Sequence, residues 1–115
     1  MLVKKNRLNK KRDFDNIFKN GKSTKGLFLV LRFIKNKLEF NRYAFIVSKK
    51  VSQKAVIRNK VRRRLLESVK KNEEKLKKGL DIIFIALPTV KDKNFLQIKE
   101  EVDSLLSKII LKDKI

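Results

Sequence analysis

The side chains with the clearest capacity for chemistry in this chain are cations that gather in one run, residues 55–67. Within it stand five cationic side chains and one amide, in the order Arg58-Asn59-Lys60-Val61-Arg62-Arg63-Arg64. Arginine offers planar pairs of donors that fit phosphate oxygens, and asparagine offers both a donor and an acceptor to the edge of a base or ribose. The run therefore predicts a binding surface for a polyanion, with RNA as the first candidate.

Groups for covalent or acid-base catalysis are scarce. The sequence has no histidine and no cysteine, which excludes a histidine general base, a thiol nucleophile, a disulfide framework and a typical zinc site. Asp13, Asp15, Asp81 and scattered glutamates could hold a metal, but Asp13 and Asp15 are two residues apart on a predicted helix and so face different directions. An autonomous nuclease is therefore disfavoured.

The net charge of +20 is unevenly distributed along the chain. Residues 1–25 hold nine cations and two anions, residues 49–78 hold thirteen and three, and residues 79–115 hold six of each. A Lys- and Asn-rich composition that merely solvated every face would be spread more evenly. The first and central segments are thus the expected binding surface.

Length and hydropathy bound the architecture. A chain of 115 residues is about one domain, spanning 1–115. No apolar run approaches the roughly 20 residues needed to cross a bilayer, and the basic N-terminus has no apolar stretch behind it. We expect a cytoplasmic protein without a membrane partner.

Hydrophobic periodicity predicts the order helix, two or three strands, helix, strand, helix. The predicted elements are a helix at 11–20 ending at Gly21, a strand at 27–34, a turn at 36–41, an antiparallel return strand at 42–48, a helix from 55 to about 78 closed by Gly79, a strand at 81–87 ended by Pro88, and a helix from about 92 to 111.

The central helix has two distinct faces. At about 100° per residue, one stripe within roughly 120° is apolar and should face the core: Ile57, Val61, Leu65 and Val69. The adjoining arc of about 140° holds Arg58, Asn59, Arg62 and Arg63. Lys60 and Arg64 lie outside this arc and are expected to be solvated charges. An ordinary exposed helix face is the alternative, but the clustering on one side favours RNA contact.

These residues resemble the signature of the protein subunit of bacterial ribonuclease P. The similarity spans nearly the whole chain, and its order and spacing are more specific than any one motif. It rests on Arg7-Leu8, Asp13-Phe14 with Phe18 and Gly21, Val47-Ser48-Lys49-Lys50, Ala55 with Arg58-Asn59-Lys60-Val61-Arg62-Arg63, and Gly79-Leu80-Asp81-Ile82-Ile83 leading to Pro88.

The resemblance implies a fold and a function. The fold would be a small α+β domain, a ribosomal-protein-like two-layer arrangement with a mixed four-stranded sheet and a left-handed βαβ crossover through the Arg-Asn helix, against the usual right-handed rule. The protein would bind the catalytic RNA that removes 5′ leaders from precursor tRNA. That RNA would perform the hydrolysis with magnesium ions that it mainly holds itself, so the protein would need no nucleophile or base of its own. We expect no organic cofactor and no obligate protein partner.

The resemblance also assigns roles to residues. Contact with the ribozyme would fall to Arg58, Asn59, Arg62, Arg63, Lys49, Lys50 and Lys60. Aromatic residues of the first helix would line a cleft for the single-stranded leader, where stacking tolerates any base. Phe14 and Phe18, four residues apart, are the candidates, and simple core packing is the alternative. Lys11, Arg12 and Arg7 would supply the electrostatic lining.

Two positions depart from the family pattern or leave it open. The family usually has another basic residue where this chain has Leu66, which makes the basic arc partly apolar. An aromatic of the following strand has no clean counterpart, and Phe28, Leu31 and Phe33 all remain candidates, with Phe33 ranked low.

Other functions remain open from the residues alone. A ribosomal or ribosome-associated RNA-binding protein of the same fold would share the charge and the order of elements. A DNA-binding module is disfavoured, because the chain shows no clear helix-turn-helix, finger or wedge arrangement.

Overall fold

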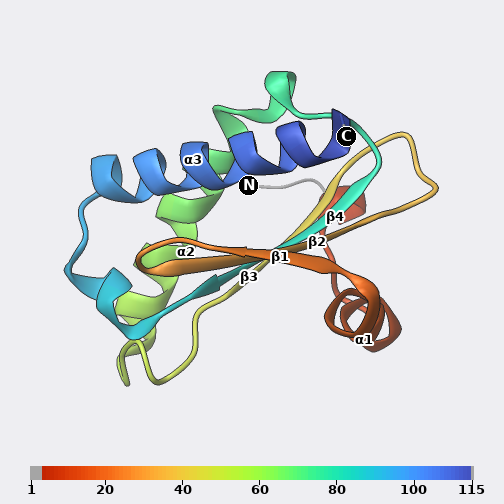
Figure 1. Cartoon of the computed structure of the whole chain (residues 1–115). Coiled ribbons are helices and arrows are strands. Elements are labelled where there is room, and N and C mark those ends of the chain that lie inside the picture. Colours follow the sequence, from red (N-terminus) through yellow and green to blue (C-terminus); the bar gives the residue numbers. More distant parts are fainter. Residues whose placement is uncertain (1–3, 115) are drawn as a thin grey trace.

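The computed structural model describes the chain from residue 4 to residue 114, and its side chains from 5 to 109. It is an α+β fold in the predicted order of helix, strands, helix, strand, helix (Figure 1). The elements are η1 (Lys4–Asn6), α1 (Lys11–Asn20), β1 (Lys22–Lys25), β2 (Leu29–Lys35), β3 (Arg42–Ile46), α2 (Ala55–Lys70), η2 (Glu73–Lys75), β4 (Leu80–Ala86), η3 (Pro88–Asp92) and α3 (Phe95–Lys114).

The four strands form one mixed sheet in the order β1-β2-β4-β3. β2 is antiparallel to β1 and to β4, whereas β3 runs parallel to β4. The prediction that residues 42–48 return alongside the preceding strand is therefore wrong, because β4 lies between β2 and β3. Six of the seven β4 residues are buried, and a strand that is apolar on both faces is most stable in the middle of a sheet.

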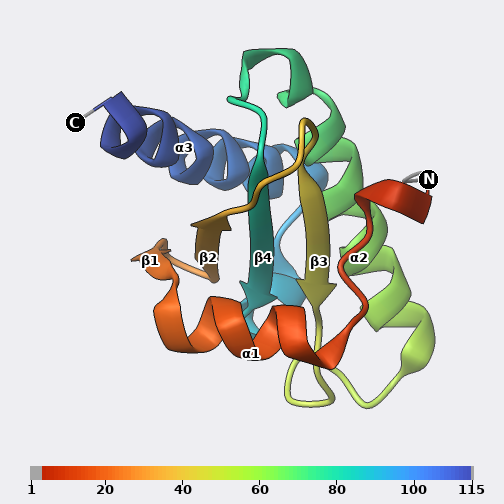
Figure 2. The same ribbon diagram turned by 90° about the vertical axis from the view of Figure 1, so that its right-hand side faces the viewer.

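The connection from β3 through α2 to β4 is a left-handed βαβ crossover. In Figure 2, β3 and β4 point the same way, β4 lies to the left of β3, and α2 lies on the face of the sheet away from α1. The crossover is thus opposite in hand to nearly all such units. The expectation drawn from the family resemblance is confirmed.

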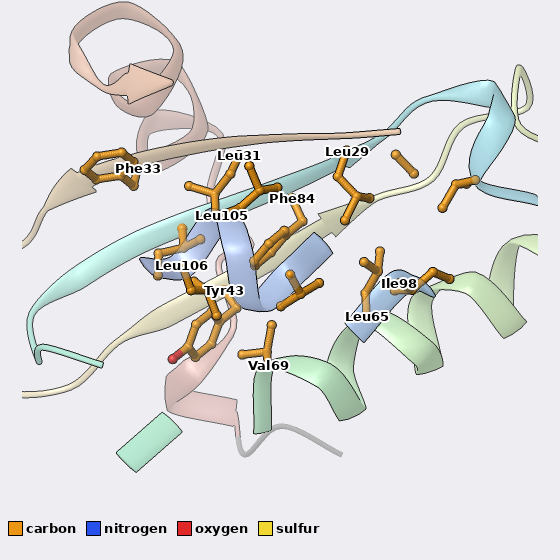
Figure 3. Close-up of a cluster of buried hydrophobic side chains, with 14 of the residues drawn as sticks. Leu29, Leu31, Phe33, Tyr43, Leu65, Val69, Phe84, Ile98, Leu105 and Leu106 are labelled. Carbon is orange, nitrogen blue, oxygen red and sulfur yellow. The ribbon is translucent and has the colours of Figure 1, made fainter. Parts of the chain in front are cut away.

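The main core lies between the sheet and the layer formed by α2 and α3. Figure 3 shows side chains of β2, β3 and β4 meeting Leu65 and Val69 of α2 and Ile98, Leu105 and Leu106 of α3. The predicted apolar stripe of α2 is confirmed for Val61, Leu65 and Val69, which are buried, and its first member, Ile57, is half-buried. α1 packs on the opposite face of the sheet (Figure 1).

The central helix ends earlier than predicted. α2 stops at Lys70, and Gly79 belongs to the turn before β4, where its φ of +86° suits glycine. Its carbonyl accepts a hydrogen bond from the Asn36 N–H at 2.8 Å. Just after the helix, the Asn72 side-chain amide donates to the Ser68 carbonyl (2.9 Å) and to Asp103 of α3 (2.6 Å).

The last helix begins three residues later than predicted. Pro88–Asp92 form η3 instead. A capping box then starts α3, in which the Asn94 side chain accepts from the Gln97 N–H (2.8 Å) and the Gln97 side chain accepts from the Asn94 N–H (2.9 Å).

Candidate nucleic-acid interface

A cleft opens where α1, the edge strand β3 and α2 meet, and we call it the α1–α2 cleft. Its volume is about 520 Å³. α2 and α3 cover one face of the sheet, while among the described residues the short helix α1 and the segment before it, with Leu8, cover part of the opposite face. The residues that line it are Arg7, Leu8, Asn9, Phe14, Tyr43, Ala44, Phe45, Ile46, Asn59, Arg62, Arg63 and Leu66.

The wall contributed by α2 is cationic and partly fixed in place. Arg62 donates one hydrogen bond to the Asn59 side-chain oxygen (2.7 Å) and another to the Val47 carbonyl (3.2 Å). These bonds orient the Arg62 guanidinium and the Asn59 amide toward the cleft before any ligand arrives. Arg63, one residue further, is exposed along the same wall. The wall thus presents donors of the kind that bind phosphate.

Arg58 is turned toward its own chain. Its Nη1 donates to the carbonyls of Ser52 and Gln53, both at 3.0 Å. The side chain therefore holds the segment that leads into α2, and Arg58 does not line the α1–α2 cleft. Its predicted contact with RNA stays a prediction.

The other cations predicted to contact RNA surround the start of α2. Lys49 and Lys50 are exposed in the turn after β3, and Lys60 is exposed on the helix. The first turn of α2 holds no acidic residue and its N-cap, Lys54, makes no side-chain capping bond. The positive end of the helix dipole thus adds to these cations, which favours binding of anions.

Arg64 was expected to be a solvated charge, and this is wrong. It is half-buried and donates to the Lys93 carbonyl at 2.8 Å. The side chain ties α2 to the segment between η3 and α3, so the role of this arginine is structural.

The cleft also has an apolar lining, to which α1, β3 and α2 all contribute. Phe14 of α1 is half-buried, Phe45 of β3 packs on the Phe84 ring with a centroid distance of 5.9 Å, and Leu66 comes from α2. The basic arc is thus partly apolar at Leu66, where the sequence departs from the family pattern.

Sequence reasoning did not find Phe45. The three open strand candidates, Phe28, Leu31 and Phe33, are all buried in the main core and none lines the α1–α2 cleft. Phe45 belongs to the predicted strand at 42–48, but nothing in the apolar run of residues 43–47 distinguishes it from its neighbours. The position of β3 at the edge of the four-stranded sheet is not visible in the sequence.

The structure separates Phe18 from Phe14. Phe18 is 44% exposed and does not line the cleft. Its ring lies under the guanidinium of Arg32 on β2, with 5.4 Å between the guanidinium carbon and the ring centroid. Lys11 and Arg12 are exposed on α1 and do not line the cleft either. The leader-binding residues predicted on α1 therefore extend beyond the cleft.

Arg7 reaches the cleft because the chain ahead of α1 runs beside β3. Arg7 forms a parallel bridge with Tyr43, and the Leu8 N–H donates to the Tyr43 carbonyl at 2.9 Å. This pairing continues the sheet at its β3 edge and places a further cation at the mouth of the cleft.

Two negative observations concern the described residues only. Among the described side chains, no three carboxylates gather into a group that could hold a metal ion. Within residues 4–114, no helix is long and apolar enough to span a membrane.

Comparison with known proteins gives one consistent result. The family model described as Ribonuclease P matches residues 2–110. The ribonuclease P protein component of Alkaliphilus oremlandii is 43% identical over 106 residues, covering 92% of this chain and 92% of that protein. The component from Clostridioides difficile is 41% identical over 102 residues, covering 88% of this chain and 89% of that protein.

Solved structures agree. The Staphylococcus aureus RNase P protein superimposes with a TM-score of 0.84 at 33% identity, covering 90% of this chain and 94% of that one. The RNase P protein from Thermotoga maritima gives a TM-score of 0.81 at 33% identity, covering 89% and 96%.

Proposed function

The chain belongs to the ribonuclease P protein family, and from that membership we propose that it binds ribonuclease P RNA and the 5′ leader of precursor tRNA, assisting the RNA in removing that leader. As a member of the family it is a protein component of an endoribonuclease that matures tRNA. We propose that the protein acts in the cytoplasm.

The observation that carries the proposal is the composition of the α1–α2 cleft. Arg62, Arg63 and Asn59 on one wall offer charge-assisted donors to phosphates, while Phe14 and Phe45 offer aromatic surface to bases. Proteins that hold single-stranded nucleic acid combine these two features, since every base has a face that can stack. A cleft with both is suited to an RNA strand of any sequence.

The two walls would contact two different RNA molecules. The cations of α2, with Lys49, Lys50 and Lys60 around its first turns, would lie against the catalytic RNA. Phe14 and the cations of α1 would face the leader, so the strand would pass between the two helices. Phe18 would extend the leader's path along α1 past the end of the cleft.

The protein would contribute no catalytic group of its own. Its sequence offers no histidine or cysteine as a base or nucleophile, and its carboxylates are dispersed among the described residues. We therefore assign the hydrolysis to the RNA and to magnesium ions that the RNA holds. The protein would then act by neutralising phosphates and by positioning the leader.

Variants from the two walls test this division. Arg63→Ala should weaken binding of ribonuclease P RNA about tenfold at fixed salt, because it removes a charge-assisted contact. Lys70→Ala removes the same charge from an exposed position on the same helix and should have a smaller effect.

Phe14→Ala should weaken binding of precursor tRNA to the holoenzyme and leave binding of mature tRNA unchanged.

Each half of the proposal has its own contrary result. Equal losses for Arg63→Ala and Lys70→Ala would show that RNA senses only the net charge. Equal losses of precursor and mature tRNA for Phe14→Ala would show that this ring supports the fold and does not contact the leader.

A further inference from the structure

The helix α1 packs on the sheet through one apolar cluster, in which Ile17 meets Leu8 and Ile83 and Phe14 lies against them. It has ten residues, and only Ile17 is buried. Its N-cap, Lys10, makes no side-chain capping bond. A helix this short is marginally stable by itself, so other contacts must fix its position over the sheet, which Figure 2 shows from the side of α1.

At its first turn, α1 is tied to the sheet by Arg42 of β3. The Arg42 guanidinium donates two hydrogen bonds to the Asp81 carboxylate of β4, at 2.8 and 2.7 Å. Its remaining nitrogen reaches Asp13 of α1 at 3.4 Å. The bond to Asp81 raises the pKa of Arg42, and Asn36 also donates to Asp81 at 2.8 Å, so the arginine is rigidly placed. Asp13 adjoins Phe14.

At its last turn, α1 is tied to the sheet by Arg32 of β2. Arg32 Nη2 donates to the carbonyls of Phe18 (2.8 Å) and Ile17 (3.3 Å), and the guanidinium also covers the Phe18 ring. A cation at the carboxyl end complements the helix dipole, as the carboxylate of Asp13 does at the amino end. The Arg32 Nε is buried without a hydrogen-bond partner among the described residues, a cost that the other contacts must offset.

We propose that Arg42, acting through Asp13, and Arg32, acting through the last turn and the Phe18 ring, are positioning residues that set the placement of α1 and so align Phe14 and Phe18 for the single-stranded leader. This inference rests on the leader contact proposed above. The two arginines would not need to touch the leader. Arg42 would act through Asp13, which precedes Phe14, and Arg32 would act through Phe18 itself. We call the Arg42–Asp13 contact and the contacts of Arg32 with the last turn of α1 the two clamps. Loss of either clamp would let α1 and its two rings shift, while the α2 wall of the cleft kept its geometry.

The test uses the holoenzyme reconstituted with its cognate ribonuclease P RNA, and measures the ratio of dissociation constants for mature and precursor tRNA. Asp13→Asn removes the anion that Arg42 reaches but leaves the Arg42–Asp81 pair intact. Asp15→Asn makes the same charge change at an exposed position two residues along α1. Likewise Arg32→Gln is matched by Lys25→Gln, which removes a cation from the exposed edge strand β1.

We expect Asp13→Asn and Arg32→Gln each to lower this ratio about fivefold, the lower end of what one stacked base contributes. The two control variants should keep the wild-type ratio, and each clamp variant should bind ribonuclease P RNA within about twofold of its charge-matched control. If Arg32→Gln does not fold, Asp13→Asn decides alone, because asparagine has nearly the shape of aspartate and little packing is lost.

The inference is overturned if the clamp variants keep the wild-type ratio, or if each loses no more than its charge-matched control. A wild-type holoenzyme that binds mature and precursor tRNA equally would instead refute the leader contact itself. The two failures are therefore distinguishable in one experiment.

Discussion

Neighbouring arginines of α2 make different contacts and so have different roles. Arg58 holds the segment before the helix, Arg62 is fixed to Asn59 at the cleft, Arg63 is exposed beside it, and Arg64 braces the connection to α3. A guanidinium with five donors binds whichever carbonyl or anion lies within reach. Which one that is depends on tertiary neighbours such as Lys93, twenty-nine residues away from Arg64.

Tyr43 provides a pH-dependent probe of the fold. Burial raises the pKa of its phenol to about 12, the hydrogen bond from Asn41 opposes this, and the negative charge of Glu73 adds to it. The folded state therefore keeps a proton that the unfolded chain releases near pH 10. This contribution to stability is complete below about pH 10 and is lost as the pH rises toward 12.

Because Tyr43 is the only tyrosine and the chain has no tryptophan, ultraviolet absorbance follows this one group. The titration midpoint should be about 12 in the folded protein and about 10 in urea. A folded protein whose tyrosine ionises near pH 10 would show that the phenol is not buried against the sheet as described.

For helices and strands, local sequence patterns predicted the type of each element more accurately than its ends and its neighbours in the fold. The 3.6-residue spacing correctly predicted the buried stripe of α2, because that stripe is a property of one helix. The end of α2 and the neighbour of β3 were predicted wrongly. Gly79 is needed for a turn against the 36–38 segment, and β4 enters between β2 and β3 from much later in the chain. Neither contact is local.

The junction of α1 and β1 shows how tightly elements can be joined. Gly21 ends α1 as predicted, but in extended backbone with φ of −77° rather than a left-handed cap. A Cβ here would lie 2.4 Å from the Ile17 carbonyl oxygen and 2.8 Å from that of Phe33. Glycine is required because two backbone segments approach closely.

Gly21→Ala should therefore lower the free energy of unfolding by roughly 1–3 kcal/mol, since rigid backbone must shift. Ser23→Ala, on the exposed β1 strand, should change it by less than about 0.5 kcal/mol. Urea denaturation followed by circular dichroism measures both, and equal stabilities for the two variants would contradict the close approach.

In the whole molecule, both the helices and the cations are unevenly distributed. α2 and α3 cover one face of the sheet, and α1 covers only part of the other, which leaves the α1–α2 cleft (Figures 1 and 2). The excess of cations falls in residues 1–25 and 49–78, whereas residues 79–115, a range that includes β4 and α3, are neutral overall. The basic composition could be read from the sequence, but its meeting with aromatic side chains in one cleft required the fold.

If this chain assists a catalytic RNA in removing the 5′ leader of precursor tRNA, as we propose, it should stimulate cleavage by that RNA. The direct measurement is reconstitution of the protein with its cognate ribonuclease P RNA and a precursor tRNA, at a magnesium concentration too low for the RNA to act efficiently alone. We predict clear stimulation of 5′ cleavage, lost steeply as salt rises because phosphate contacts release counterions. The proposed function would be wrong if protein that circular dichroism shows to be folded gave no stimulation.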